Sequence, residues 1–348
     1  MLVLDNLIYR WQHSGGISTV WYELTKRIIQ ERCDYMFLEY ANSNTFNHLR
    51  ALEEIPENRL RILSDKHFTI KRYLPINYEY NSPFVFHSSY YRNCSNTNAV
   101  NIITIHDFTY ELFRKGLAKR IHTFTKSKAI ANANYIVCIS QNTKRDLLRF
   151  HPNTDRNKIK VIYNGVSDSF HPNNTNNEDY LLFVGDRGGY KNFNLAVQAA
   201  AQEKMKLIIC GKPISKKERD KLEQIIPGGY IEKGFVSEQE LNTLYNKAFA
   251  LIYPSSYEGF GLPVIEAQKA GCPVIVMDSS SLPEVIGCKE MLCNPSIPNE
   301  IALRINYLKD KVNRNHVIQS GLEKASEFSW DKTFAAYNQL YNNIEKGF

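Results

Sequence analysis

Short apolar runs and longer segments with helical spacing alternate along the 348 residues of this chain. In the first half, apolar runs occupy residues 1–9, 83–87, 101–105 and 135–140. Helical spacing is clearest over residues 17–30, which follow a pair of glycines. Each apolar run leads into a polar loop or a helix, which is the pattern of βαβ units in a parallel sheet. The first half is therefore predicted to be one doubly wound α/β domain.

The second half repeats this pattern. Strands are predicted over residues 180–184, 206–210, 250–253 and 273–277, and helices over residues 194–203, 216–226, 238–248 and 262–270. Two more helices are predicted over residues 301–309 and 330–344. The pattern indicates a second parallel sheet of the nucleotide-binding type, followed by helices.

The domain boundary is predicted in a polar segment. Residues 171–179 read His-Pro-Asn-Asn-Thr-Asn-Asn-Glu-Asp, which is rich in turn formers and has nothing apolar to bury. We therefore predict domains at residues 1–172 and 173–328. Residues 329–348 are predicted to form a separate helix, whose apolar positions recur at steps of three and four and must pack against another element.

Composition limits the class of protein. A hydrophobic content of 43% is enough for two cores, and no apolar run approaches the roughly 18 residues of a membrane span. The first residues carry Asp5 and no basic stretch, so we expect no secretory signal. Seven cysteines without a Cys-x-x-Cys pair indicate reduced thiols in the cytoplasm, with no zinc ribbon or disulfide framework.

The net charge of +7 is unevenly distributed. Residues 1–165 hold 23 Lys+Arg against 14 Asp+Glu, whereas residues 166–348 hold 20 against 22. A basic half suggests an anionic partner, such as a nucleic acid, a membrane surface or a phosphate-bearing substrate. We expect no nucleic acid, because the sequence has no zinc-finger spacing, no aromatic RNP pattern and no basic helix that continues into heptads.

A basic amphipathic segment over residues 111–131 leaves two interpretations open. Its apolar positions are Leu117, Ile121 and Phe124, and its basic positions are Arg114, Lys115, Lys119, Arg120, Lys126 and Lys128. The usual interpretation is a solvated helix. The alternative is a patch, together with Lys66, Lys71 and Arg72, that meets anionic lipid or a lipid-linked pyrophosphate at the inner membrane face.

The most specific motif is Tyr-Glu-Gly-Phe-Gly-Leu-Pro-Val-Ile-Glu-Ala over residues 257–267, between a predicted strand and a predicted helix. Gly259 and Gly261 let the backbone approach a ligand, and Pro263 suits the first turn of a helix whose N-terminus favours an anion. Glu258 and Glu266 could accept hydrogen bonds from hydroxyl groups, and Glu258 could instead steady a positive charge. The alternative is a capping loop with two solvated acids.

A second motif, Gly-Asp-Arg-Gly-Gly-Tyr-Lys-Asn over residues 185–192, directly follows a predicted strand. Arg187 and Lys191 are predicted to converge on a charge at the carboxyl end of the sheet, where open α/β sheets bind ligands. Two such cations would suit a departing diphosphate. Basic turns are also common on surfaces, so the motif is weak by itself.

The first domain offers two weaker candidates. His-Ser-Gly-Gly-Ile over residues 13–17 opens a predicted helix and could contact a phosphate. His106-Asp107 ends a predicted strand, where such a pair is more often structural than catalytic. The sequence has no Asp-x-Asp pair to hold Mg²⁺ on a pyrophosphate, so we expect no metal and no other cofactor.

Taken together, these motifs resemble the family-four retaining glycosyltransferases of the GT-B fold. The residues that carry the resemblance are Gly15-Gly16, His106-Asp107, Arg187, Lys191-Asn192, Gly234-Phe235-Val236, Glu258 and Glu266. The resemblance spans nearly the whole chain except residues 40–100, where acceptor specificity is expected. It implies two Rossmann-like domains with doubly wound parallel sheets facing a central cleft, and a C-terminal helix that crosses back to the first domain.

The resemblance also implies roles for individual residues. Glu266 would hold the ribose of the donor, Glu258 its sugar, and Arg187 with Lys191 its pyrophosphate. The implied catalytic residues are His106, Arg187, Lys191 and Glu258. The implied donor-binding residues are Gly16, Gly185, Phe235, Val236, Gly259, Phe260, Gly261, Leu262 and Glu266.

The expected reaction is transfer of a sugar from a nucleotide-diphosphate donor to a glycan or lipid-linked acceptor. Residues 185–192 resemble the corresponding loop of bacterial surface-polysaccharide enzymes, which favours a GDP-mannose-type donor, with UDP-sugars next. Three alternatives stay open: a nucleotide-sugar epimerase, a sugar phosphorylase, and a non-catalytic module that binds a nucleotide sugar.

Overall fold

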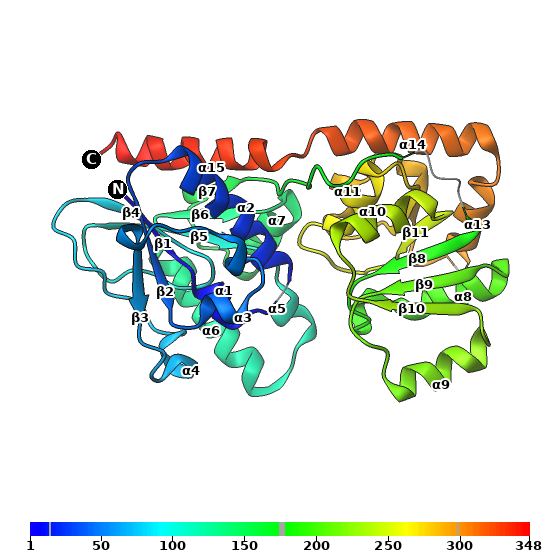
Figure 1. The fold of residues 1–348 in the computed structure, drawn as a ribbon, viewed down its shortest axis with the longest axis horizontal. Helices are drawn as coiled ribbons and strands as arrows, with labels where there is room; N and C mark the ends of the chain where they lie inside the picture. Colours follow the sequence, from blue (N-terminus) through cyan, green and yellow to red (C-terminus); the bar gives the residue numbers. More distant parts are fainter. Residues whose placement is uncertain (14, 174–177, 298) are drawn as a thin grey trace. The chain divides into compact units, whose positions relative to one another are not determined.

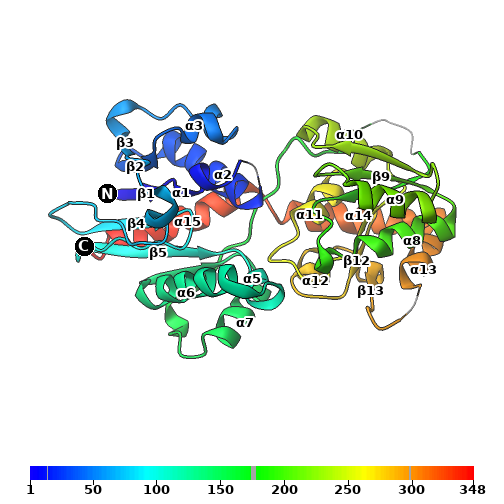
Figure 2. The same cartoon turned by 90° about the horizontal axis from the view of Figure 1, so that it is seen from below.

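The computed structural model describes residues 1–13, 15–173, 178–297 and 299–348, and the chain divides into two compact units. The first unit comprises residues 1–165 and 330–348, and the second comprises residues 166–329. Each unit contains one parallel sheet with helices packed on it (Figure 1, Figure 2). The two parallel sheets confirm the predicted fold class.

The first sheet has seven strands in the order β3-β2-β1-β4-β5-β6-β7, and all their pairings are parallel. The strands are β1 (Leu2–Asp5), β2 (Tyr35–Tyr40), β3 (Leu60–Leu63), β4 (Phe84–Ser88), β5 (Ala99–Ile105), β6 (Tyr135–Cys138) and β7 (Ile159–Val161). Every residue of β1 and β4 is buried, because helices cover both faces of the sheet.

The helices of the first unit are α1 (Leu7–Trp11), α2 (Gly16–Glu31), α3 (Ser43–Phe46), α4 (Phe68–Lys71), α5 (Thr109–Phe113), α6 (Gly116–Asn132), α7 (Gln141–Phe150) and α15 (Trp330–Glu345). Short 3₁₀ turns are η1 (Arg50–Leu52), η2 (Glu57–Arg59) and η3 (Arg156–Lys158). The predicted strand over residues 1–9 is in fact β1 followed by α1. The predicted helix over residues 111–131 is divided into α5 and α6, because Arg114 and Lys115 are extended and Gly116, which begins α6, has a left-handed φ of 79°.

The second sheet has six strands in the order β10-β9-β8-β11-β12-β13, also all parallel. The strands are β8 (Tyr180–Val184), β9 (Lys206–Cys210), β10 (Tyr230–Gly234), β11 (Ala250–Tyr253), β12 (Val274–Met277) and β13 (Leu292–Cys293). The helices are α8 (Phe193–Glu203), α9 (Lys216–Ile225), α10 (Glu238–Lys247), α11 (Leu262–Lys269), α12 (Leu282–Val285), α13 (Glu300–Tyr307) and α14 (Lys311–Ser326), with the turns η4 (Gly189–Lys191) and η5 (Lys289–Met291).

Several elements were not predicted from the pattern. Strand β2 contains the buried, charged Glu39, and the partly exposed β3 contains Arg61, so neither reads as a simple apolar run. Helix α14 buries only Val317, Gly321 and Ala325, which gives it a weak apolar face. These elements are held by tertiary packing and not by a strong local pattern.

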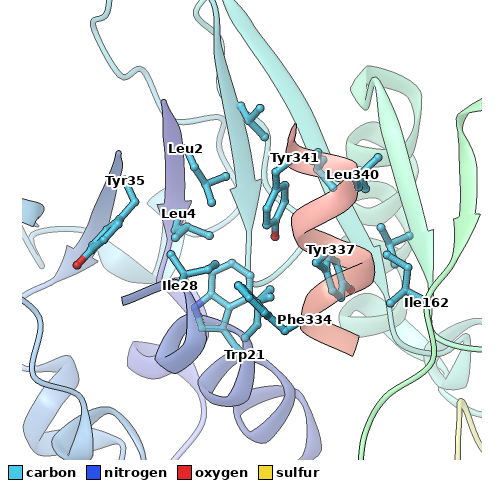
Figure 3. Close-up of a cluster of buried hydrophobic side chains, with 14 of the residues drawn as sticks. Leu2, Leu4, Trp21, Ile28, Tyr35, Ile162, Phe334, Tyr337, Leu340 and Tyr341 are labelled. Atoms are coloured by element: carbon cyan, nitrogen blue, oxygen red, sulfur yellow. The ribbon is translucent and has the colours of Figure 1, made fainter. Parts of the chain in front are cut away.

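Helix α15 completes the core of the first unit, although it lies at the other end of the chain (Figure 3). Phe334, Tyr337 and Tyr341 pack in one cluster with Trp21 of α2 and with residues of β1. The Tyr341 hydroxyl lies 2.7 Å from Nδ1 of the buried His87, and the Tyr337 hydroxyl lies 3.0 Å from Thr104 Oγ1. This packing confirms the predicted C-terminal helix on the first domain.

The second unit begins at Val166, a few residues before the boundary placed at 172/173. Residues 166–172 belong to it because Phe170 packs edge-on against Tyr245 and the His171 N–H donates to Asn242. Residues 174–177 of the predicted linker lie outside the described residues.

Six of the seven cysteines are buried, Cys33 is exposed, and all seven are free thiols. Among the described residues, no helix is long and apolar enough to cross a membrane.

Candidate functional site

Three strand ends meet at the carboxyl edge of the second sheet. The Gly185 N–H donates to Cys210 O, and the Gly211 N–H donates to Gly234 O. Gly211 has a φ of 137°, and a Cβ there would lie only 2.5 Å from Gly185 O, so the β8 and β9 loops can approach this closely only with glycine at this position. The motif over residues 185–192 therefore forms a loop that begins at the carboxyl end of β8, where open α/β sheets bind ligands.

Lys191 and Glu258 form an ion pair at this edge, with Lys191 Nζ 2.6 Å from Glu258 Oε1. Their side chains are 14% and 12% exposed, so the pair is largely withdrawn from water. Burial alone would lower the pKa of Lys191, but the neighbouring Tyr253 and Glu258 raise it overall. Lys191 is thus a fixed positive charge, and Glu258 steadies it, which is one of the two roles that the sequence suggested for Glu258.

Hydrogen bonds with Ser280 and Ser281 hold the loop from Glu258 to Leu262 in place. The Glu258 N–H donates to Ser280 Oγ at 2.8 Å, and Ser281 Oγ donates to the carbonyls of Glu258 and Phe260, each at 2.9 Å. Gly261 has a φ of 106° and precedes α11, where a Cβ would lie 3.1 Å from Leu282. These contacts fix the position from which α11 begins.

The second predicted glutamate, Glu266, lies in α11 and is half-buried. Tyr245 of α10 donates its hydroxyl to Glu266 Oε2 at 3.1 Å, and Tyr245 is the one hydrogen-bond partner of this carboxylate in the described part of the chain. Burial raises the pKa of Glu266 to about 7. The carboxylate therefore keeps acceptor capacity for a ligand, and its charge depends on pH near neutrality.

Arg187 and Lys191 contact different protein groups in this structure, and their convergence on a diphosphate stays a prediction. Arg187 Nε donates to Glu218 Oε1 at 2.8 Å, and its two other nitrogens donate to the carbonyls of Lys212 and Pro213. The side chain is only 5% exposed. Its hydrogen bond is the main reason that the pKa of Glu218 falls to about 2. In this structure Arg187 ties the β8 loop to the loop before α9.

The loop after β10 carries Gly234, Phe235 and Val236. Gly234 has a φ of 67°, Val236 is half-buried, and Phe235 is 72% exposed. Ser237 then caps α10 in a reciprocal capping box with Glu240. The cap fixes the loop, and the exposed ring of Phe235 is the kind of surface on which a base can stack.

In the first unit, Gly16 begins α2 and is exposed. The Ser18 N–H at this helix start donates to Gln12 Oε1 at 3.2 Å, so a side-chain oxygen already occupies one of the donors that a phosphate would use. Ser14, part of the predicted motif, lies outside the described residues.

His106 directly follows β5 and is buried. Burial lowers its pKa to about 4, so the imidazole is neutral at pH 7. Asp107 Oδ1 accepts at 3.0 Å from the N–H of Thr109, the first residue of α5. Within this pair, Asp107 has a structural role, and His106 can offer a neutral hydrogen-bonding group.

The predicted basic segment is corrected at Lys126. Its side chain is fully buried, with Nζ 2.9 Å from Glu111 and 2.7 Å from Asp107 O, so it does not belong to a surface patch. Arg72 is also half-buried, with its guanidinium 3.3 Å from the ring centre of Trp11. The exposed part of the segment comprises Phe113, Arg114, Lys115, Leu117, Arg120, Ile121, Phe124 and Lys128.

A hollow of about 860 Å³ opens in the second unit, between the 185–192 loop, α8, α9 and the segment that leads to α13. Arg187, Lys217, Lys221 and Asn194 line it, but Lys191, Glu258 and Glu266 do not. Gly189 and Asn192 of the 185–192 loop and Ser256, just before the 257–267 motif, also line it, so the hollow adjoins the carboxyl edge at which the motifs lie.

Four supporting residues were missed by sequence reasoning: Glu218, Tyr245, Ser280 and Ser281. The serine run at residues 279–281 follows a predicted strand, so its place at the carboxyl edge could have been inferred. Tyr245 and Glu218 gave no signal, because their partners lie 21 and 31 residues away on other elements.

Two family models match the chain in succession. The model described as Glycosyltransferase Family 4 matches residues 14–170, and the model described as Glycosyl transferases group 1 matches residues 167–324. The chain belongs to the family-four glycosyltransferases. The resemblance inferred from the motifs is thereby confirmed.

Relatives of this chain include O-antigen chain mannosyltransferase B of Escherichia coli, which is 32% identical over 47% of this chain and 46% of that protein. O-antigen chain mannosyltransferase RfbU of Salmonella typhimurium is 29% identical over 56% of each chain. The chain thus spans about half the length of the curated relatives it matches. The structure of Anabaena HepE in complex with UDP and glucose is 14% identical, with a TM-score of 0.72 over 98% of this chain and 99% of that chain, which shows a shared fold.

Glu266→Gln is expected to stabilise the protein increasingly as pH rises from 5 to 8. In the wild type the folded-state pKa of about 7 exceeds the ordinary value of 4.5, so the folded state binds the proton more tightly and loses stability as pH rises through this window. Glutamine removes that loss. Melting temperatures across the pH range check this, with the exposed Glu323→Gln as a matched control. A Glu266→Gln difference that is flat with pH would contradict the burial of a titrating carboxyl group.

Proposed function

We propose that the protein is a retaining glycosyltransferase that moves a hexosyl group, of the mannosyl type, from a nucleotide-diphosphate sugar to a glycan or lipid-linked acceptor in polysaccharide biosynthesis. The observation that carries the proposal is the arrangement at the carboxyl edge of the second sheet, where the Lys191–Glu258 pair and the Glu266 carboxylate lie on the loops and helix that follow β8 and β11. The names of the two mannosyltransferase relatives support the mannosyl type.

Positively charged groups and carboxylates would hold different parts of the donor. Lys191 and Arg187 would meet the diphosphate, Arg187 by exchanging Glu218 for it, and Glu266 would accept hydrogen bonds from the ribose hydroxyls with its available oxygen. The backbone of residues 259–262 and Glu258 would contact the sugar, Gly185 would leave room for the phosphates, and Phe235 and Val236 would lie beside the base. The 185–192 loop favours a GDP-mannose-type donor over UDP-sugars. The structure of Anabaena HepE, which shares the fold, contains bound UDP, so UDP-sugars are the second choice.

The proposed transfer needs no enzymic nucleophile. The bond from the sugar C1 to the phosphate oxygen breaks, the bond from C1 to the acceptor oxygen forms on the same face, and the acceptor proton passes to the departing phosphate. Negative charge accumulates on the diphosphate as the bond breaks, and a fixed Lys191 ammonium stabilises that charge more than it stabilises the intact donor. No resident metal is required for this step.

The first unit is proposed to add His106 and Gly16 as ligand contacts. A neutral imidazole can donate or accept one hydrogen bond to a sugar hydroxyl without adding charge. Gly16 offers backbone at the start of α2, provided that the Gln12 side chain moves from the Ser18 N–H.

The test is product analysis with a panel of nucleotide sugars, including GDP-mannose and UDP-glucose, and a panel of glycan acceptors in the presence of EDTA. We expect acceptor-dependent release of nucleoside diphosphate and an α-linked product from an α-linked donor. Turnover without acceptor would indicate an epimerase, a requirement for free phosphate would indicate a phosphorylase, and donor binding without turnover would indicate a binding module. Loss of turnover in EDTA that Mg²⁺ restores would overturn the metal-free step.

Lys191→Ala is expected to reduce kcat by a factor on the order of 10²–10³, with a smaller loss of donor affinity, because the charge acts mainly as the diphosphate departs. The matched control is Lys212→Ala, since the Lys212 side chain is 64% exposed and pairs with the exposed Asp186 in the same unit. Steady-state kinetics and circular dichroism measure both variants. If folded Lys191→Ala turns over within about threefold of the wild type, the diphosphate is held elsewhere. Arg187→Ala is expected to reduce kcat too. It is also expected to lower the free energy of unfolding, because Arg187 hydrogen-bonds to Glu218 and to the carbonyls of Lys212 and Pro213.

We also propose that an anionic membrane surface is a partner of the first unit. Leu117 and Phe124 of α6 are each 70% exposed, and no acidic residue occurs from Leu112 to Arg145. In the same unit, helix α4 also carries an exposed apolar residue beside an exposed basic one, Ile70 and Lys71. Exposed apolar side chains between basic ones are typical of helices that lie in a membrane interface.

Binding to vesicles that contain anionic lipid is expected to weaken between 0.1 M and 1 M salt, as the Debye length falls from about 10 Å to about 3 Å. Replacing Leu117 and Phe124 by serine should reduce binding further, whereas Leu52→Ser, at a 65% exposed position on η1, should not. Co-sedimentation measures all three proteins. Absence of binding at low salt, or equal binding by the two variants, would contradict the proposed surface.

A further inference from the structure

A thiol, a carboxylate and an imidazole come together away from the candidate donor site. Cys288 Sγ, a carboxylate oxygen of Glu290 and a ring nitrogen of His316 all lie within 4.8 Å of one another. Cys288 Sγ lies 3.1 Å from Glu290 Oε2. Cys288 is buried, while Glu290 and His316 are exposed, so the group is reachable from solvent on one side.

The group lies at the opposite edge of the second sheet from Lys191 and Glu258. Cys288 and Glu290 come just before β13, which pairs in parallel with β12, so they lie at the amino edge. Lys191 and Glu258 follow the carboxyl ends of β8 and β11. The two groups of residues are therefore separate features of one unit.

The backbone around Cys288 is fixed against the helix that carries His316. A Cβ on Gly287 would overlap Ser320 O, so the chain passes directly over α14 at the residue before Cys288. Gln268 holds the same segment by accepting from the Gly287 N–H at 2.7 Å and donating to Val285 O at 2.8 Å. His316 is one helical turn before Ser320 and shares its face of α14. Cys288 and His316 are thus placed by rigid contacts that do not involve their own side chains.

We infer that Cys288, Glu290 and His316 form a binding site for Zn²⁺. Sulfur, nitrogen and oxygen donors in one set match zinc, whereas Mg²⁺ and Ca²⁺ prefer oxygen ligands alone. Three protein ligands leave the fourth tetrahedral position for water. Glu290 and His316 are exposed, so rotation of their side chains would be what brings their ligand atoms to bonding distance, and Arg304 is engaged in an ion pair with Glu300 at 3.1 Å.

The bound ion would link the segment before β13 to α14 and so stabilise the second unit. Binding takes the thiolate form of Cys288 and releases its proton to the solvent. The site takes no part in the proposed transfer step, so the two proposals can fail separately.

The test uses the full chain freed of metal, titrated with Co²⁺ as a spectroscopic substitute for Zn²⁺. We expect one equivalent of Co²⁺ to give a thiolate-to-metal absorption band with the visible bands of a tetrahedral ion, and Zn²⁺ to abolish them. Cys288→Ser should remove the thiolate band, and His316→Ala should weaken binding by at least about tenfold, since even the loss of a supporting group costs that much. Zn²⁺ should raise the melting temperature of the wild type and not that of Cys288→Ser.

Cys33→Ser is the matched control, because Cys33 is the exposed cysteine and lies in the other unit. This variant should keep the band. A thiolate band that persists in Cys288→Ser or disappears in Cys33→Ser would overturn the proposal, as would the absence of any band. Since His316 is exposed, an unchanged melting temperature of metal-free His316→Ala would show that a loss of binding is not a loss of folding.

Discussion

Parallel pairing of the strands is the constraint on which the rest of the structure depends. All the described pairings in both sheets are parallel, so each strand must be followed by a crossover that returns the chain to the amino edge. Loops that leave the strands therefore gather at one edge, and loops that enter them gather at the other. Lys191 and Glu258 lie together because of the first set of loops, and Cys288 meets His316 at the second.

Burial of charge explains why the charged residues of this chain have such different roles. Asp5 with Arg92 and Glu111 with Lys126 are pairs of nearly or fully buried charges, which would be costly to bury alone. The first pair connects segments 87 residues apart, and the second connects the consecutive helices α5 and α6. Their positive members count toward the net charge of +7 but offer nothing to an external partner, so the basic surface is smaller than the composition suggests.

The charged groups proposed to bind the donor all have partners within the protein. Lys191 is paired with Glu258, Arg187 with Glu218, and Glu266 with the Tyr245 hydroxyl. Such contacts keep the charged groups in position at low conformational cost, and a diphosphate would exchange one ion pair for another instead of binding bare charges. Ser280 and Ser281 also limit the conformational cost of binding, because they hydrogen-bond to the backbone of Glu258 and so fix its loop.

The sequence by itself determined the two parallel-sheet domains and the location of the motif over residues 257–267, because strands buried on both faces, glycines and a helix-initiating proline leave local signatures. It also predicted that α15 must pack on another element. Only the tertiary structure decided that Arg187 is held by Glu218, that Lys126 is buried against Glu111, and that Cys288 meets His316. The physical reason is that the partner and the solvent exposure of a charged or ligating side chain are set by residues from other elements, which no local pattern encodes.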